Sequence, residues 1–462
     1  MGTLVLLSAC SLADRFSPPP TRPPAQWSNP AAAPAAWPSA DWWRQFGSAR
    51  LDQLMADAQA ANFDIAAAIA RVRQADAQAR VAGAPLLPSV QADGSFKRQR
   101  GPWVSTSSTS TSSRTGKAPI TNSYDGTLSA SYEIDFWGKN RAALEAAEAA
   151  AQASRFDQQT VALTVQSSVA TTYFDVLGGL ERIRVAADNI ANGEGVLEAI
   201  RDRVAAGTAT ALDLAQQESV VAAQRATIAP LEQQWRQNVN ALAILTGRQP
   251  DQMSLNPEKL AQLGIPAVAP GLPSELLVRR PDVQFAEAQL QGANADIGAA
   301  RAAFFPSISL TAEGGFTSSA LATLIDHKSL FTSLANSITQ PIFQGGKLEG
   351  NLEQKKARYD ELVANYRKAV AQAFSDVENG LIAVEQTAAE EAAQREAERT
   401  ARNAYDIAQS QFRAGIIDIT TLLNTQSRLF TAEDNLAQAR LAHLQATVTL
   451  YKAMGGGWTA AR

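Results

Sequence analysis

Apolar and polar residues alternate strictly over residues 123–136, where every second residue from Tyr124 to Phe136 is apolar or glycine. A period of two places the apolar residues on one face of an extended strand and the polar residues on the other. Three other stretches alternate less cleanly. The sequence therefore predicts four strands in two pairs, at about 88–100 and 123–136, and at 306–316 and 330–343.

Two long stretches, 139–206 and 347–414, contain no proline and are rich in Ala, Gln, Glu, Leu and Arg, which favour helix. A continuous helix over either stretch would be on the order of 100 Å long. Each stretch ends near a glycine and is followed by a second helix-forming stretch. The sequence predicts two helical hairpins, over about 139–246 and 347–454.

Two features interrupt the first hairpin. The glycine pair within 176–181 ("VLGGLE") predicts a break in its long helix. Pro230 should kink the returning helix, because proline removes an intrahelical hydrogen bond, whereas its counterpart Gln438 should not.

The chain repeats itself. Gly207 and Gly415 are 208 residues apart, and the same offset relates "IDFWGK" to "IFQGGK" and "LTGRQP" to "AMGGGW". An earlier landmark, "LPSV" against "FPSI", has an offset of 218, because the first half holds ten extra residues in its Ser/Thr-rich loop. Such self-similarity indicates a tandem duplication. We expect repeats over 48–250 and 272–456, a connector over 251–271 and a tail over 457–462.

The N-terminal region has the features of a targeting signal. Cys10 follows Leu7-Ser8-Ala9 behind a short apolar run, as in a bacterial lipoprotein signal, so we expect residues 1–9 to be a signal remnant and Cys10 to carry covalent lipid. The bland alternative is a lone cysteine in an apolar leader. Residues 10–47 include a Pro- and Ala-rich segment that predicts an extended tether.

Composition excludes several classes of function. The 462 residues have a net charge of −4, which gives no case for nucleic-acid binding. One cysteine and two histidines allow no internal disulfide, no Cys/His metal site and no catalytic triad, so we expect neither an enzyme nor a cofactor beyond the lipid. His443 is expected to lack a partner. No apolar run of about 18 residues follows the N-terminus, so any membrane crossing must use strands.

Four strands cannot close a barrel in a bilayer, since about eight is the smallest closed set. The strands form either a soluble sheet or part of a barrel closed by several copies. Three copies would supply twelve strands around an aqueous lumen, lined by the polar faces. The acidic residues of those faces are Asp125, Glu133, Asp135 and Glu313.

The ordered set of motifs resembles a known family. The Cys10 signal, the "PSV" and "PSI" strand starts, "DFWGK", "FQGGK", "FRAG" and "TTLLNTQ" are similar to those of the TolC-like outer membrane factors, most closely the lipidated OprM-type (NodT) branch. The resemblance implies an α+β membrane protein. Its homotrimer would form a twelve-stranded β-barrel in the outer membrane, continued by a long α-helical barrel in the periplasm.

The resemblance also implies a function. Such a protein would be lipid-anchored and membrane-spanning. It would be the passive exit duct of a tripartite efflux pump for drugs or other small molecules, with a periplasmic adaptor and an inner-membrane pump of the resistance-nodulation-division type as partners. Two alternatives stay open: a duct for type I protein or peptide secretion, and a soluble coiled-coil scaffold.

Within this family the two glycine turns would be periplasmic tips. The residues expected to contact the adaptor are Val204, Ala205, Ala206, Gly207, Thr208, Arg413, Ala414, Gly415 and Ile416. The residues expected to narrow the lumen are Asp213, Asp418, Thr420 and Asn424. Asn424 stands where related proteins commonly have aspartate. Asp213 and Asp418 could equally be caps of the returning helices, because both lie in a first turn.

Overall fold

The computed structural model describes all residues except 1–14, 29–36, 102–119, 254–257, 269 and 459–462. The chain divides into two compact units. Unit 1 comprises the described residues of Met1–Pro19, Arg73–Gln152 and Ala288–Ala364, and unit 2 comprises those of Pro20–Val72, Ala153–Glu287 and Asn365–Arg462. In the described parts of the chain, no helix combines the length and the apolar character needed to cross a membrane.

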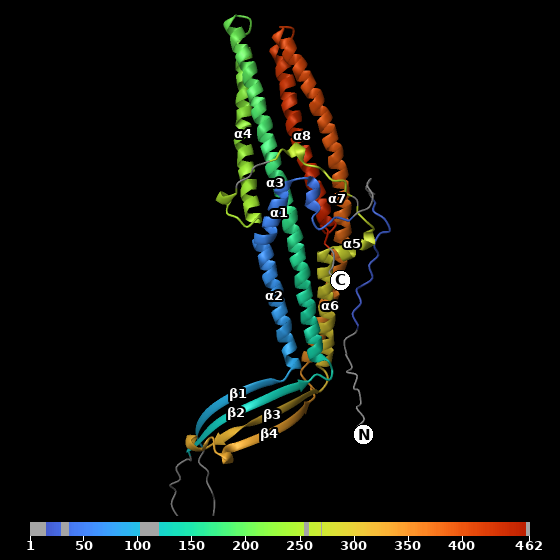
Figure 1. Cartoon of the computed structure of the whole chain (residues 1–462). Coiled ribbons are helices and arrows are strands. Elements are labelled where there is room, and N and C mark those ends of the chain that lie inside the picture. Colours follow the sequence, from blue (N-terminus) through green and yellow to red (C-terminus); the bar gives the residue numbers. More distant parts are fainter. Residues whose placement is uncertain (1–14, 29–36, 102–119, 254–257, 269, 459–462) are drawn as a thin grey trace, which may run out of the picture. The chain divides into compact units, whose positions relative to one another are not determined.

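Unit 1 contains one antiparallel sheet of four strands in the order β1-β2-β3-β4 (Figure 1). The strands are β1 (Ser89–Arg100), β2 (Ile120–Ile134), β3 (Ser307–Ser318) and β4 (Leu330–Thr339). All four expected strands are present, although β2 begins earlier and ends two residues sooner than the alternation predicts. Within the described residues the outer edges of β1 and β4 have no partner strand.

The sheet has two chemically different faces. On the polar face, the register aligns Ser95, Asp125 and Thr317 across three strands, and hydroxyl pairs such as Ser309–Ser337 (2.7 Å) join neighbours. The other face is apolar and open to its surroundings in the single chain. Its exposed side chains include Val90, Phe96, Leu128, Ile134, Leu310, Leu330, Leu334 and Ile338. The alternation of the sequence thus produces the two faces it predicts.

The helices of unit 1 are parts of α2 (Phe63–Gly83), α3 (Lys139–Ala205), α6 (Pro281–Ala302) and α7 (Lys347–Arg413). A small core forms where Leu290 and Ala293 of α6 meet Leu362 of α7. Small residues let α6 approach α3 closely: a Cβ on Gly292 would lie 3.3 Å from the carbonyl oxygen of Ala146.

Unit 2 contains α1 (Ala49–Ala61), α4 (Ala211–Leu245), α5 (Pro273–Arg279), α8 (Ile419–Ala453) and the remainders of α2, α3, α6 and α7. Its main core is aromatic. Trp42 and Phe46 are fully buried, and the ring of Trp42 stacks on Tyr451 with centroids 5.0 Å apart. Burial of such large rings supplies much of the hydrophobic stabilisation. Short 3₁₀ turns complete the chain: Trp42–Phe46, Ala84–Leu86, Pro250–Gln252, Leu260–Gln262, Leu321–Thr323 and His327–Ser329.

The two helical hairpins have equal dimensions. Helices α3 and α7 each have 67 residues, and α4 and α8 each have 35. The helix starts Lys139 and Lys347 are 208 residues apart, as are Ala211 and Ile419. The internal duplication inferred from the sequence is confirmed.

The predicted break in the first long helix is wrong, because α3 runs without interruption through 176–181. Gly178 makes room for a neighbouring helix instead, whereas a side chain at Gly179 would be in ordinary contact. A Cβ on Gly178 would lie 2.8 Å from a methyl carbon of Leu441, and one on Gly179 would lie 3.5 Å from Trp235. Packing against these side chains holds the helix together despite the low helix propensity of glycine. Helix α4 includes Pro230 within its length, and the kink expected there stays a prediction.

Candidate functional site

Both glycine turns have the same backbone geometry. Gly207 (φ 69°) and Gly415 (φ 74°) adopt the left-handed conformation that glycine reaches at low cost. In the first turn the amide of Thr208 donates to the carbonyl of Arg203 (2.8 Å), and in the second the amide of Ile416 donates to that of Gln411 (2.9 Å). The amides of Gly207 and Gly415 also donate, to the carbonyls of Val204 and Phe412 (both 3.0 Å), so these are Schellman motifs, which satisfy the last carbonyls of a helix.

The turns expose most of the predicted docking residues. Ala205, Ala206, Gly207, Thr208, Arg413, Ala414, Gly415 and Ile416 are exposed, and Val204 is half-buried. Beneath them Ile200, Phe412 and Leu422 belong to a buried cluster joining α3, α7 and α8. A groove of about 710 Å³ separates the two turns and is lined by residues of both, including Asp213 and Asp418. The residues predicted to dock the adaptor therefore lie over a packed base.

Asp213 and Asp418 both cap the helices that follow the turns. Thr210 is the N-cap of α4, and the carboxylate of Asp213 accepts from the backbone amide of Thr210 (2.8 Å), forming a capping box. Asp418 is the N-cap of α8 and accepts from the amide of Thr421 (2.9 Å). Hydrogen bonds from the Thr421 side chain and backbone hold the pKa of Asp418 below its ordinary value. Thr420 and Asn424 are exposed, one helical turn apart.

Arg203 joins the two turns, which the sequence did not reveal. Its Nη2 donates to the carbonyls of Phe412 (2.5 Å) and Arg413 (3.2 Å), the last residues of α7. Its guanidinium carbon also lies 4.3 Å from the centroid of the Phe412 ring. A cation at a helix C-terminus is favourable because of the helix dipole. The only signal in the sequence was a basic residue in the last turn of α3.

A buried ionic cluster lies between α7 and α8. The side chain of Glu391 is 6 % exposed and accepts from Arg440 (2.8 Å), Arg395 (2.6 Å) and Nδ1 of His443 (2.8 Å). Arg440 also donates to three carbonyls within 260–263. Burial raises the pKa of Glu391, but the bonds and charges of His443 and Arg440 outweigh burial, so the pKa is lowered. The expectation that His443 lacks a partner is wrong, because its partner lies 52 residues away.

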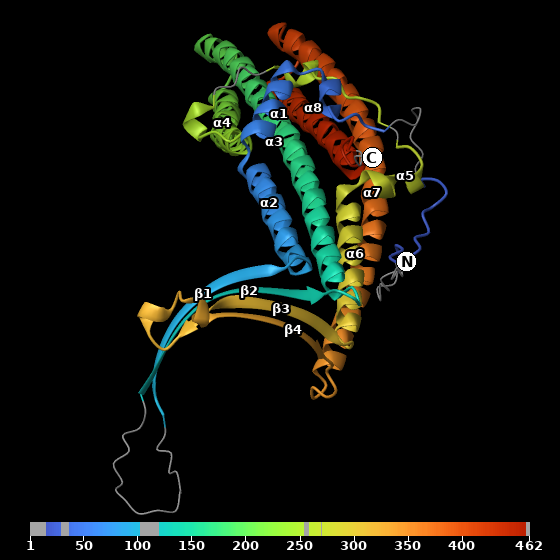
Figure 2. The ribbon, with the colours of Figure 1, turned by 60° about the horizontal axis from the view of Figure 1, so that its bottom comes forward.

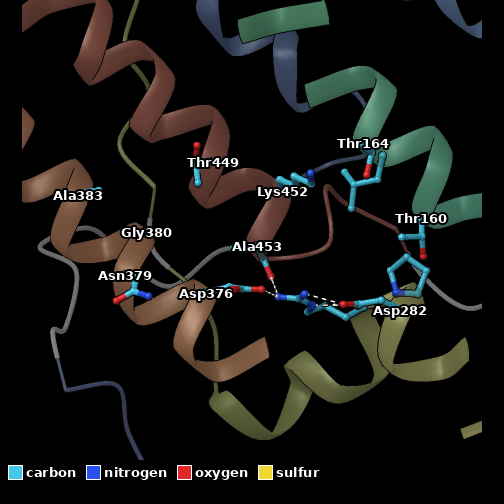
Figure 3. Close-up of a pocket in the computed structure, with 13 residues that line it drawn as sticks. Thr160, Thr164, Asp282, Asp376, Asn379, Gly380, Ala383, Thr449, Lys452 and Ala453 are labelled. Carbon is cyan, nitrogen blue, oxygen red and sulfur yellow. Dashed lines mark hydrogen bonds and ion pairs between the residues drawn. The ribbon is translucent and has the colours of Figure 1, made fainter. Parts of the chain in front are cut away.

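A cavity of about 480 Å³ is lined by Arg280 and twelve other residues. Figure 3 shows these lining residues, among them Asp282, Asp376 and Ala453. The buried guanidinium donates to Asp282 (2.6 Å), to Asp376 (2.8 Å) and to the carbonyl of Ala453 (3.3 Å). Burial alone would lower the pKa of Arg280, but the two carboxylates raise it above its ordinary value. Arg280 thus joins α6, α7 and α8 through these three acceptors.

The predicted lumen residues divide into two sets. Asp125 lies on the polar face near the end of the pairing of β2 with β3 and accepts from the hydroxyls of Ser95 (3.1 Å) and Thr317 (2.5 Å). Glu133 and Glu313 lie on the same face, opposite Ser309 and Ser129 in the register. This set fits the prediction of an acidic face.

Asp135 departs from the prediction. It lies beyond the end of β2, and its carboxylate accepts from the amides of Asn140 (3.0 Å) and Arg141 (2.9 Å) at the start of α3. The chain turns before Asp135 can continue the alternation, so this residue caps a helix and is not on the face of a strand. Cys10, the predicted lipid attachment, lies outside the described residues.

The family model for "Outer membrane efflux protein" matches residues 54–248 and 272–456, which are most of the chain. The chain belongs to the outer membrane efflux protein family. It is 42 % identical to the pyoverdine export outer membrane protein OpmQ of Pseudomonas putida, over 99 % of this chain and 97 % of that protein. It is 40 % identical to OpmQ of Pseudomonas aeruginosa, over 100 % of this chain and 98 % of the relative.

Solved structures agree. The outer-membrane channel OprN superposes with a TM-score of 0.90 at 26 % identity, covering 97 % of this chain and 100 % of that one. The open state of the MtrE outer membrane channel of Neisseria gonorrhoeae superposes with a TM-score of 0.87 at 28 % identity, covering 97 % and 98 %. The predicted family, channel fold, outer-membrane location and efflux function are confirmed. The alternative of a soluble coiled-coil scaffold is wrong.

Proposed function

We propose that three copies of this chain form one channel, the exit duct of a tripartite efflux pump. The observation that carries the proposal is a four-stranded sheet with an acidic polar face, an exposed apolar face and two unpaired edges. Such a sheet fits lipid on one side and water on the other. Three copies bring twelve strands together.

Closure by several copies follows from the cost of open edges. Each unsatisfied backbone group in lipid costs several kcal/mol, and the outer edges of β1 and β4 each present a row of them. Pairing β4 of one copy with β1 of the next removes both edges. The apolar face then meets lipid, and Asp125, Glu133 and Glu313 line a water-filled lumen. Substrates would cross by diffusion, and the inner-membrane pump would supply the energy for transport.

The exposed turns at Gly207 and Gly415 would dock a periplasmic adaptor, which links the duct to an inner-membrane pump of the resistance-nodulation-division type. Ile416 supports this assignment, because an aliphatic side chain 71 % exposed at a tip is suited to an apolar contact. The cargo would be a small molecule. A siderophore is the first candidate, since OpmQ is named for pyoverdine export.

The residues Asp213, Asp418, Thr420 and Asn424 would surround the aperture of the assembled tips. In a trimer each becomes a ring of three, and the carboxylates add negative charge that attracts cations. Their capping bonds are compatible with this role, because a capping carboxylate still carries its charge. Lipid on Cys10 would add a second anchor in the outer membrane.

Two measurements test the proposal. In detergent, the purified protein should have about three times the chain mass of 49.1 kDa. In a strain lacking the gene, the wild-type gene should restore dye efflux, and Ile416→Asp should not, although it still forms trimers. The control is Ile325→Asp, which alters an aliphatic side chain 82 % exposed in the β3–β4 connection and should restore efflux fully. A monomeric mass, or equal efflux by both variants, would refute the assembly or the docking role respectively.

A further inference from the structure

The charged residues of the sheet are divided between its two faces. All acidic residues of the four strands, which are Asp93, Asp125, Glu133 and Glu313, lie on the polar face. The apolar face carries no acidic residue in any described strand, but it carries Arg98 and Arg100 of β1. The apolar face is therefore positively charged at one end.

The type of side chain on the apolar face changes along the β1–β2 hairpin, and the two arginines lie at the far end of this change. Toward the far end of the β1–β2 hairpin, the paired residues are Ala92–Leu128, then Phe96–Tyr124, then Arg98–Asn122 and Arg100–Ile120. The register of β3 with β2 ends at the Tyr124–Ser318 pair, so the arginines lie on the part of the hairpin that extends past β3 (Figure 2). Aliphatic residues thus give way to aromatic residues and then to arginines.

The aromatic pair marks a depth in the membrane. The rings of Phe96 and Tyr124 lie 4.7 Å apart, and Phe96 is 59 % exposed on the apolar face. Aromatic residues at this position form the girdle of outer-membrane barrels at the boundary of hydrocarbon and headgroups. With a strand rise of about 3.4 Å per residue and a tilt of about 40°, Arg98 lies about 5 Å and Arg100 about 10 Å beyond that boundary. These are headgroup depths.

The guanidinium groups are available for a ligand. Among the described residues neither Arg98 nor Arg100 has a hydrogen-bond or ion-pair partner, and both are exposed. The nearest acid along the strand pair, Asp125, lies on the other face and is engaged by Ser95, Ser123 and Thr317. Guanidinium binds phosphate in a planar bidentate geometry that amides and ammonium groups do not match.

We infer that Arg98 and Arg100 bind the phosphate groups of the phosphorylated glycolipid in the outer leaflet of the outer membrane. The inference rests on the proposed barrel, in which the apolar face meets lipid. Three copies place six arginines in a ring around the outer rim. The ring fixes the height of the barrel in the membrane and orders the lipid next to it.

The test uses the full-length trimer in detergent and three probes: bisphosphorylated lipid A, dephosphorylated lipid A and inorganic phosphate. Wild type should bind the bisphosphorylated lipid in preference to the other two. Arg98→Gln with Arg100→Gln should weaken that binding about tenfold or more, because two charge-assisted contacts per site are lost. Arg98→Lys with Arg100→Lys should recover part of it, since charge remains without the bidentate geometry.

Lys97→Gln is the matched control, since Lys97 precedes Arg98 on β1 but lies on the polar face. It should leave lipid binding unchanged. Equal losses for Lys97→Gln and the double variant, or equal binding of both lipids, would overturn the inference. Full competition by inorganic phosphate would also overturn it, in favour of a soluble anion site. The mass in detergent and the dye efflux tell a failure of this inference from a failure of the proposed barrel. Trimers that transport dye but show no lipid preference refute only this inference, whereas a monomeric mass refutes the proposed barrel as well.

Discussion

Replacing Arg203 by alanine tests whether the contact between the two turns holds the tips together. The change removes the bonds from Nη2 to the carbonyls of Phe412 (2.5 Å) and Arg413 (3.2 Å) and the contact with the Phe412 ring. It leaves the backbone of both turns intact, because the Schellman bonds use main-chain groups only. The variant should therefore fold and assemble normally.

The size of the effect follows from these contacts. A hydrogen bond from a charged donor contributes about 1.5–3 kcal/mol when buried, and a cation over an exposed ring contributes about 0.5–1 kcal/mol. Arg203 is half-buried, and water replaces part of what is lost, so we take about 2 kcal/mol for the whole contact. That energy corresponds to about a 30-fold shift toward separated tips in each chain.

Single-channel conductance of the reconstituted trimer measures this shift. Arg203→Ala should raise the open probability, whereas Arg201→Ala should not. Arg201 is the matched control, because its ion pair with Glu218 (3.2 Å) lies within the first hairpin. Unchanged conductance in Arg203→Ala, or an equal rise in Arg201→Ala, would refute the reasoning.

Three further predictions concern stability and anchoring. Gly415→Ala should lower the free energy of unfolding by about 1 kcal/mol, because alanine is strained at this positive φ although the added Cβ meets open space. Gly455→Ala should lower it several times more, because the added Cβ would also lie 2.1 Å from the carbonyl oxygen of Arg279. Thermal unfolding of the trimer measures both changes. Glu391→Ala should lower the free energy of unfolding by about 3 kcal/mol, because it removes the carboxylate partner of the mostly buried Arg440 side chain. The pKa of Glu391 is lowered in the folded state, so its contribution to the free energy of unfolding is full above about pH 4.5 and is lost as the pH falls toward the lowered pKa. Acid unfolding of the wild type, compared with that of Glu391→Gln, measures this loss. Cys10→Ser should weaken membrane attachment while trimers persist, and total loss of folding would contradict it.

The local periodicity of apolar and polar residues predicts most of the strands and helices. The alternation over 123–136 and the absence of proline over 139–206 and 347–414 are signals within single elements, and strands and helices occur there. The duplication was equally visible, because one offset holds along much of the second half. Periodicity depends on residues close together in the sequence, and the duplication depends on two similar stretches of sequence, so both can be recognised without knowing which residues are in contact.

The features that sequence reasoning missed depend on partners far away. Gly178 breaks no helix because Leu441 packs against it. His443 and Arg203 gain their roles from Glu391 and Phe412, and nothing within either residue's own helix announces the partner. Asp135 departs from the alternation for a local reason: β2 ends one residue before it, and its carboxylate accepts from amides in the first turn of α3, which alternation alone cannot detect.

The two tips are copies in backbone but not in chemistry. At the N-terminus of the returning helix, the first copy has Thr210 as the cap and Asp213 three residues later, and the second reverses the order with Asp418 and Thr421. In both copies the cap side chain accepts from the amide three residues later, which belongs to Asp213 in the first copy and to Thr421 in the second, so the exchange preserves this bond while it moves the carboxylate by about one turn of helix. The counterpart of Arg203 is Gln411, which carries no charge and so could not replace it. The contact between the tips therefore runs in one direction, from the first copy to the second. Duplication supplied two equal hairpins, and side-chain divergence made one the donor and the other the acceptor of the bond that joins them.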